Sequence, residues 1–148
     1  MAERKSVLLV EDNPDDRDLT LRAFERHNLR DAVEVAEDGE AALQYLHAPG
    51  PGGQVRPLPD VVLLDLKLPR LDGLEVLRRI RAAERTRLLP VVMLTSSAEE
   101  QDLVKSYSLG ANSYVRKPVS FTEFVDAARE LGVYWLLLNR SAPRERGA

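Results

Sequence analysis

The chain contains no cysteine in its 148 residues, and aromatic side chains make up only 5% of them. Without cysteine it forms no disulfide and has no thiolate for catalysis or metal binding. The apolar run Val7–Val10 is too short for a signal peptide, and no run approaches the roughly 20 apolar residues that cross a bilayer. We therefore expect a soluble, cytoplasmic protein.

A basic excess is also missing, because the formal net charge is −3. Proteins that bind nucleic acid through its phosphates normally carry a surplus of Lys and Arg. The 44% hydrophobic and 30% charged residues are typical of a globular protein, and the length suits one core. We expect one domain over residues 1–139, a flexible tail at 140–148, and no nucleic-acid or membrane partner.

Short apolar runs alternate with segments of helical periodicity along the whole chain. The expected strands are 7–10, 33–36, 61–66, 91–95 and 113–116. Helix starts follow them, such as Asn13 before Pro14 and Ser120 before Glu123. Pro90 is expected to end the third helix and Gly110 the fourth. This βαβαβαβαβα order predicts an α/β fold with a parallel sheet covered by helices on both faces.

Proline and glycine crowd residues 48–59, which separate the second helix from the third strand. The segment is too broken for regular structure and too long for a minimal connection. Because it leads into the start of a strand, it should lie at the N-terminal edge of the sheet. We interpret it as a tolerated surface insertion.

Functional side chains lie at the carboxyl ends of four of the five expected strands: Glu11 and Asp12, Asp65, Thr95, and Lys117. The carboxyl ends of parallel strands share one edge of the sheet, where ligands bind in open α/β folds. One Asp after a strand would be read as a turn residue. Three acids at one edge are different, since two charges about 4 Å apart repel by roughly 4 kcal/mol. A cation between them relieves this repulsion, and oxygen-only ligands favour Mg²⁺.

The other two groups suit an oxyanion facing that cation. A lysine ammonium and a threonine hydroxyl are donors for phosphoryl oxygens, so Asp65 would be the nucleophile that forms an aspartyl phosphate. The plainer interpretation of Lys117 as a solvated lysine, and of Thr95 as a residue chosen for its β propensity, remains open at this point.

Four motifs in the order EDNPDD, LLDLKLPRLDGLEVL, VVMLTSS and SYVRKP resemble those of response regulator receiver domains. The resemblance runs from about Lys5 to Leu131. It implies a flavodoxin-like (βα)5 fold with strand order 2-1-3-4-5. It also implies that Asp65 accepts a phosphoryl group from a phosphohistidine of a sensor histidine kinase.

The same resemblance assigns the Mg²⁺ ligands. Asp12 and Asp65 would bind the ion directly, with the backbone carbonyl of Lys67, and Glu11 would act through water. Lys67 also flanks the expected path of an attacking water, as does Ser97, so we expect both to tune the lifetime of the phosphoryl bond.

Three further roles follow from the resemblance. Thr95 would be the switch hydroxyl, Tyr114 an aromatic ring that turns from exposed to buried, and Lys117 the phosphate contact, with a cis peptide bond before Pro118. A ring that responds to a new dianion in this way forms a two-state element. Without the resemblance, Tyr114 would be read as an ordinary aromatic residue of an edge strand.

The last helix ends in VYWLLL, Val133–Leu138, which is apolar nearly all round, unlike a surface helix. This extension resembles the single-domain response regulators that work with bacterial phytochromes, several of which dimerise through an extended C-terminus. We therefore expect a phytochrome kinase as partner and a homodimer formed through Tyr134, Trp135, Leu137 and Leu138. The alternative is that this segment folds back onto its own subunit.

Since no output domain is expected beyond Ala148, the output would be a partner protein, or the chain would be a phosphate shuttle or sink. We do not expect the protein to act as an enzyme, apart from catalysing its own phosphorylation and dephosphorylation. A Mg²⁺ phosphohydrolase would need a second acid where Lys67 stands, and a flavodoxin-like cofactor binder would not place acids after the first strand. A docking module independent of phosphorylation would usually have lost one site residue.

Overall fold

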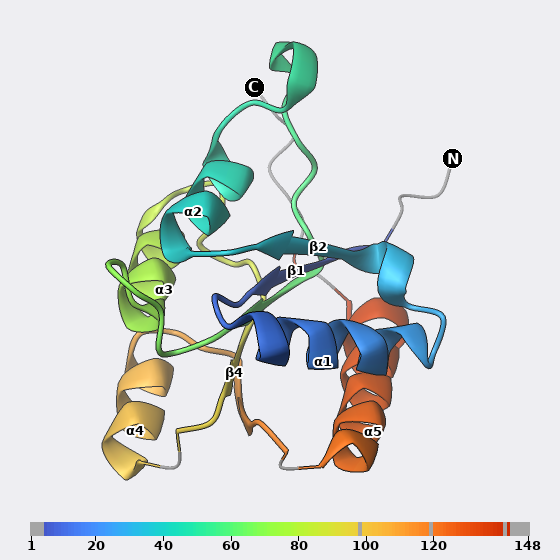
Figure 1. Ribbon diagram of the computed structural model, residues 1–148. Helices are drawn as coiled ribbons and strands as arrows, with labels where there is room; N and C mark the ends of the chain where they lie inside the picture. Colours follow the sequence, from blue (N-terminus) through green and yellow to red (C-terminus); the bar gives the residue numbers. More distant parts are fainter. Residues whose placement is uncertain (1–4, 98, 119, 141, 143–148) are drawn as a thin grey trace.

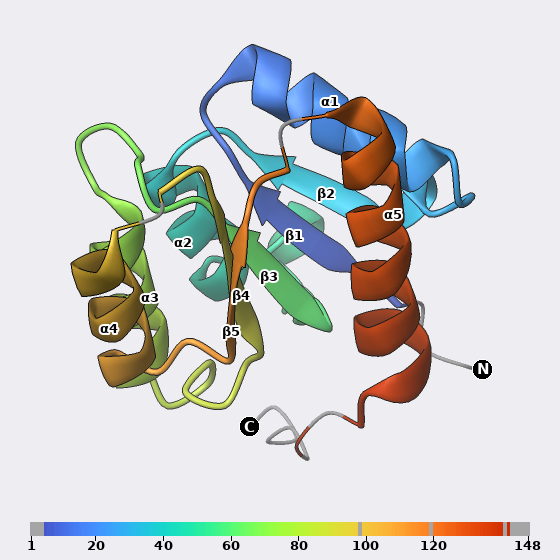
Figure 2. The ribbon, with the colours of Figure 1, turned by 90° about the horizontal axis from the view of Figure 1, so that it is seen from below.

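A five-stranded parallel sheet forms the centre of the computed structural model, which describes residues 5–97, 99–118, 120–140 and 142. The strands are β1 (Val7–Val10), β2 (Val33–Ala36), β3 (Val61–Leu64), β4 (Val91–Thr95) and β5 (Ser113–Arg116). They pair in the order β2-β1-β3-β4-β5, which confirms the expected flavodoxin-like order (Figure 1 and Figure 2). The first motif, which follows β1, and the last motif, which ends after β5, therefore both lie at the carboxyl edge of one sheet.

Helices cover both faces of this sheet. Among the described residues the α-helices are α1 (Pro14–Glu25), α2 (Gly39–His47), α3 (Gly73–Ala82), α4 (Glu100–Ser108) and α5 (Phe121–Gly132). Figure 2 shows α1 and α5 side by side on one face, and α2, α3 and α4 on the other. Within the part of the chain that the structure describes, no helix is both long enough and apolar enough to span a membrane.

The apolar runs are buried on both sides because successive side chains of a strand point to opposite faces. In β3, Val62 and Leu64 pack toward α2 and α3, whereas Val61 and Leu63 pack toward α1 and α5. All four are at most 1% exposed. The central strand thus anchors both halves of the core and fixes where its carboxyl end lies.

Side-chain caps begin α1 and α5 where the sequence predicts them. Asn13 accepts hydrogen bonds from the backbone N–H groups of Asp15 and Asp16, and Ser120 accepts one from Glu123. The predicted end of α3 at Pro90 is wrong, since the helix ends at Ala82. The chain then turns through residues 83–89, where Thr86 donates its hydroxyl to the carbonyl of Ile80.

Residues 48–59 lie before β3, at the end of the sheet opposite Asp65, as expected. They are less irregular than predicted, because Pro51–Gly53 forms a short 3₁₀ turn in which Gly52 and Gly53 have positive φ. The guanidinium of Arg56 stacks 4.5 Å from the ring of Tyr45. This contact ties the loop to the end of α2.

The apolar end of α5 continues as a π-helix, η3 (Val133–Leu138). The expected dimer surface is wrong in one residue: Trp135 is only 8% exposed and packs in the core beneath α5 with Leu136. Tyr134, Leu137 and Leu138 remain exposed. The tail expected at 140–148 lies outside the described residues apart from 140 and 142.

Candidate functional site

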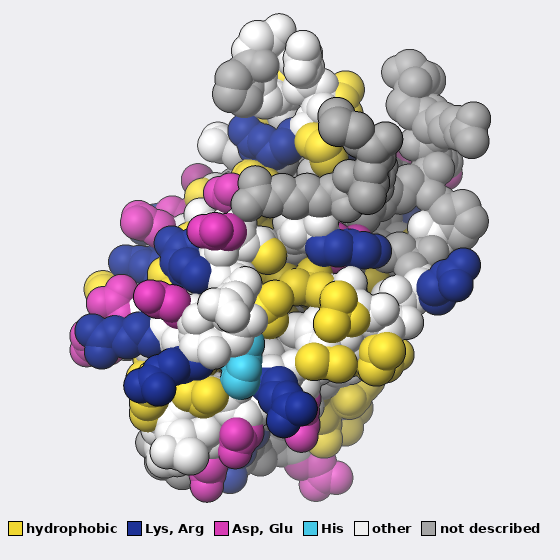
Figure 3. Space-filling model, turned by 90° about the vertical axis from the view of Figure 1, so that its right-hand side faces the viewer, with side chains coloured by type: hydrophobic (Ala, Val, Ile, Leu, Met, Phe, Trp, Pro, Cys, Tyr) yellow, Lys and Arg dark blue, Asp and Glu magenta, His cyan; other side chains and the backbone are white. Residues whose placement is uncertain are grey.

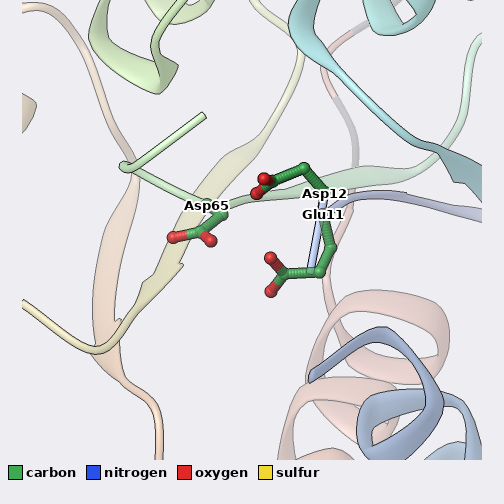
Figure 4. A group of neighbouring side chains, drawn as sticks. All are labelled: Glu11, Asp12 and Asp65. Carbon is green, nitrogen blue, oxygen red and sulfur yellow. The ribbon is translucent and has the colours of Figure 1, made fainter. Parts of the chain in front are cut away.

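Three carboxylates converge where β1 and β3 end. Glu11 and Asp12 follow β1, Asp65 follows β3, and one oxygen of each lies within 4.8 Å of the others. Figure 4 shows the three groups directed toward a common space. Glu11 is 1% exposed and Asp65 7% exposed, whereas Asp12 is more accessible. The predicted acidic cluster is therefore present and largely out of bulk water.

Lys117 reaches into this cluster from the end of β5. Its Nζ donates hydrogen bonds to Glu11, to Asp16 at 2.9 Å and to Asp65 at 3.3 Å. Burial lowers the pKa of Lys117, but the bonds to Glu11 and Asp16 and the charge of Asp65 outweigh it and hold that pKa above the usual lysine value. The ammonium is therefore a fixed positive charge beside Asp65.

Burial also changes the protonation of Glu11. Removal from water, followed by the contact with Asp65, raises the pKa of Glu11 to about 7, although Lys117 acts in the opposite direction. One lysine therefore does not neutralise this cluster fully. A carboxyl group that shares a site with other acids takes up a proton unless another cation is near.

The donor set fits a hard divalent cation. Three carboxylates that offer only oxygen, two of them buried, match the ligands that Mg²⁺ takes in proteins. Lys117 supplies one positive charge against Glu11, Asp12, Asp16 and Asp65, so the excess is negative. A divalent cation together with Lys117 would therefore balance the charge of these acids better than Lys117 alone.

Close backbone packing fixes the position of Asp65. The N–H of Gly73, at the start of α3, donates to the carbonyl of Leu66 at 2.9 Å. A Cβ atom at Gly73 would lie 2.2 Å from the backbone oxygen of Asp65. Only glycine lets α3 approach the end of β3 so closely. Asp72 begins this helix by accepting the N–H of Glu75.

Thr95 ends β4, and the side chain of Tyr114, near the start of the neighbouring β5, reaches the loop that follows Thr95. Thr95 is fully buried, and its carbonyl accepts the N–H of Lys117 at 2.7 Å. Its Oγ1 accepts the N–H of Ser97 at 3.3 Å, and the hydroxyl of half-buried Tyr114 donates to the carbonyl of Ser97 at 3.0 Å. Ser97 thus contacts both residues of the predicted switch.

Two acids at this edge were missed by the sequence analysis. Asp16 lies in the first turn of α1 and accepts a hydrogen bond from Lys117. Asp102 lies in the first turn of α4 and contacts Ser97 and Lys67. Each is the third residue of a helix that follows a strand. Acids are common at this position because they suit the helix dipole, so the sequence carries no signal that separates these two from ordinary first-turn acids.

The expected cis bond before Pro118 is wrong, because the described residues contain no cis peptide bond. The trans isomer is the more stable form of an X–Pro bond, and Lys117 reaches the acidic cluster with that isomer.

An open hollow of about 620 Å³ lies beside Lys117 and is lined by Asp16 and Arg116, among others. It leaves room for a second molecule to approach the cluster.

The chain is similar in sequence and in structure to known proteins. The probable methanogenesis regulatory protein FilR2 of Methanothrix harundinacea is 48% identical over 135 residues, which is 91% of this chain and 86% of the relative. The bacteriophytochrome response regulator AtBRR is 54% identical, with a TM-score of 0.70 over 94% of this chain and 100% of that one.

The phosphorylated cyanobacterial phytochrome response regulator RcpA is 32% identical and superposes with a TM-score of 0.85, over 95% of this chain and 100% of its own. The model of the response regulator receiver domain matches residues 7–129. This range includes all five strands and every acid of the cluster. The chain therefore belongs to the response regulator receiver domain family, the signalling domain of two-component systems.

Proposed function

We propose that Asp65 is the phosphoacceptor of this receiver and that a sensor histidine kinase supplies the phosphoryl group. The observation that carries the proposal is the position of Asp65, at the buried end of the central strand, beside two further acids and the ammonium of Lys117. A carboxylate in this position is held ready to attack, with a positive charge beside it to meet the incoming oxygens.

The transfer needs one bond to form and one to break. A carboxylate oxygen of Asp65 attacks the phosphorus of a phosphohistidine, and the P–N bond breaks. Its electron pair stays on the imidazole nitrogen, which leaves with the donor protein. Lys117 is placed to donate to a phosphoryl oxygen, and the hydroxyl of Thr95 is the second donor at the edge.

Asp12 and Asp65 would hold Mg²⁺ directly and Glu11 through water, in the carboxylate cluster at the ends of β1 and β3. The backbone carbonyl of Lys67 is the further ligand that the resemblance to receiver domains implies. When bound, the ion supplies charge neutralisation for the transferring oxygens. The pKa of Glu11, raised first by burial and then by the contact with Asp65, is consistent with this proposal, since a bound cation would favour the ionised carboxylate.

The contacts of Ser97 support a switch that involves Thr95 and Tyr114. In the structure the Thr95 Oγ1 accepts the N–H of Ser97, and the Tyr114 hydroxyl donates to the carbonyl of Ser97. A phosphoryl group that recruits Thr95 would break the first contact and release the loop that carries the second. The Tyr114 ring then turns inward, so the phosphoryl group shifts the populations of two states.

The names of two relatives favour a phytochrome as the donor kinase, since RcpA and AtBRR are both phytochrome response regulators. The output would be a protein–protein contact, with the homodimer through Tyr134, Leu137 and Leu138 as the first candidate. These side chains are 50%, 74% and 65% exposed. A phosphate shuttle or sink is the alternative output that uses the same transfer.

The direct test is incubation with acetyl phosphate and Mg²⁺, followed by intact-mass measurement. We expect one added phosphoryl group in the parent protein, none with Asp65→Asn and none in excess EDTA. Asp15→Asn removes the exposed acid directly before Asp16, the α1 carboxylate that contacts Lys117. As the matched control it should be phosphorylated like the parent.

Phosphorylation of Asp65→Asn to the parent level would contradict the proposal. Steady release of phosphate from small phosphate esters, with no stable adduct, would instead favour the Mg²⁺ phosphohydrolase. Transfer from a phosphorylated phytochrome kinase at a higher rate than from an unrelated kinase tests the choice of donor.

A further inference from the structure

A buried acid of α4 joins the two loops that border the candidate phosphoacceptor. Asp102 is 7% exposed. Its Oδ2 accepts the hydroxyl hydrogen of Ser97 at 2.6 Å and lies 3.7 Å from the Nζ of Lys67. One carboxylate oxygen thus holds a residue from the loop after β3 and a residue from the loop after β4.

Each of these partners is one contact away from the site. The backbone N–H of Lys67 lies 3.4 Å from an oxygen of Asp65. Ser97 contacts Thr95 through its N–H and Tyr114 through its carbonyl. Asp102 touches neither the acidic cluster nor the switch, but it restrains the residues next to both.

We infer that Asp102 is an anionic latch, which holds the Lys67 ammonium and the Ser97 loop in the unphosphorylated position and competes with a phosphoryl group on Asp65 for Lys67. This inference rests on the proposed function and adds a regulatory residue to it. A lysine side chain is a point charge on a long flexible stem, so it moves readily between two anions. A phosphoryl group, with a charge near −2, attracts it more strongly than one carboxylate does.

Release of Lys67 has a consequence for α4. Asp102 would then keep only the Ser97 hydroxyl, while the recruitment of Thr95 pulls on the same loop. The restraints at the start of α4 therefore weaken together. The outer face of that helix carries three exposed apolar side chains, Leu103, Val104 and Tyr107, so their presentation to a partner changes with the latch.

A purely structural role for Asp102 has a different signature. An acid in the first turn stabilises a helix through its dipole, and this effect does not depend on Lys67. The competition does depend on it. A double-mutant cycle between the two residues separates these roles, because only the latch predicts that the two substitutions are non-additive.

The test measures the rate of phosphoryl uptake from acetyl phosphate with Mg²⁺ by intact mass. Asp102→Asn keeps an acceptor for Ser97 but loses the charge, so Lys67 is free to approach the phosphoryl group. We expect uptake to become roughly two- to fivefold faster, the range of a partly exposed ion pair. In a Lys67→Gln background the same substitution should have no further effect. Glu100→Gln removes an exposed acid of the same helix and should leave the rate unchanged.

Parent-like uptake by Asp102→Asn overturns the latch, as does equal acceleration in the Lys67→Gln background, which would indicate only a long-range charge effect. If the parent itself takes up no phosphoryl group, the proposed function fails and the latch falls with it. Should thermal unfolding show that Asp102→Asn does not fold, Asp102→Ser, which keeps a polar partner for Ser97, replaces it in the same cycle.

Discussion

At the scale of single residues, burial of the Glu11 carboxyl group disfavours its charged form. Glu11 is 1% exposed and lies beside Asp65 and Lys117. Its pKa is raised from 4.5 to about 7 because burial disfavours its charged form. The folded protein therefore binds this proton more tightly than the unfolded chain between these two pH values, and stability falls as pH rises through that window.

We predict that the metal-free protein becomes less stable between pH 4.5 and about 7 through Glu11, by on the order of 3 kcal/mol at about 1.4 kcal/mol per pKa unit. Above pH 7 this contribution is constant. Thermal unfolding in EDTA across pH 5 to about 8 measures it as the difference between the parent and Glu11→Gln, whose amide does not titrate.

The same pH dependence in Glu11→Gln would show that another group is responsible. Saturating Mg²⁺ serves as a second check, because a cation that favours the ionised carboxylate should flatten the profile of the parent.

The sequence predicted the members of the site that follow a strand directly. Glu11, Asp12, Asp65 and Lys117 meet as expected because the carboxyl ends of parallel strands must share an edge. Asp16 and Asp102 could not be separated in this way from ordinary first-turn acids. Whether such a side chain turns toward the site depends on the angle at which its helix leaves the sheet, and no local pattern encodes that angle.

At the scale of secondary-structure elements, Arg81 connects three segments at the end of the sheet opposite the site. This half-buried side chain of α3 donates to the carbonyls of Gly110 at 2.9 Å and Leu89 at 2.7 Å, and to the side chain of Asn112 at 2.9 Å. It therefore fastens the last turn of α3 to the start of β4 and to the turn between α4 and β5.

Arg81→Met keeps the stem volume and removes these bonds. We predict a loss of about 2–3 kcal/mol in the free energy of unfolding, since hydrogen bonds to charged groups contribute about 1.5–3 kcal/mol. Urea denaturation measures it. Arg79→Met is the matched control, because Arg79 is exposed and pairs only at the surface with Glu75, where such a pair contributes about 0–1 kcal/mol. Equal losses in both variants would disprove the role of Arg81.

Two elements differ from the prediction because contacts between segments, which a local sequence pattern does not show, decide their form. The helix that ends at Ala82 was expected to reach Pro90, because proline is a visible stop signal. The structure ends it earlier through the bonds that Arg81 and Thr86 make to backbone carbonyls. Likewise, the π-helical winding of Val133–Leu138 turns Trp135 and Leu136 inward, which a period of 3.6 residues does not predict.

At the scale of the whole molecule, apolar side chains gather on the face that α5 contributes to (Figure 3). The π-helix η3, which follows α5, contributes four side chains that are at least 36% exposed: Val133, Tyr134, Leu137 and Leu138. Exposed apolar patches of this kind commonly mark protein interfaces. Since Trp135 is buried in its own subunit, the patch is smaller than the sequence indicated.

We predict that the protein forms a homodimer at tens of micromolar, measured by analytical ultracentrifugation. Leu137→Glu should raise the dissociation constant at least about tenfold, which is about 1.4 kcal/mol, because it places a charge in an apolar interface. Val55→Glu alters an equally exposed apolar residue, 69% exposed in the 48–59 loop, and should have no effect. A parent that sediments only as a monomer would remove the dimer.

The chain contains one tryptophan, Trp135, seated edge-on to the Tyr134 ring at a centroid distance of 4.9 Å. This side chain belongs to the segment that follows α5, yet its indole is packed with the core on that side of the sheet. Its ultraviolet emission is thus a native spectroscopic probe of whether the C-terminal turns stay docked. The docking can be followed in real time during phosphorylation without attaching any dye.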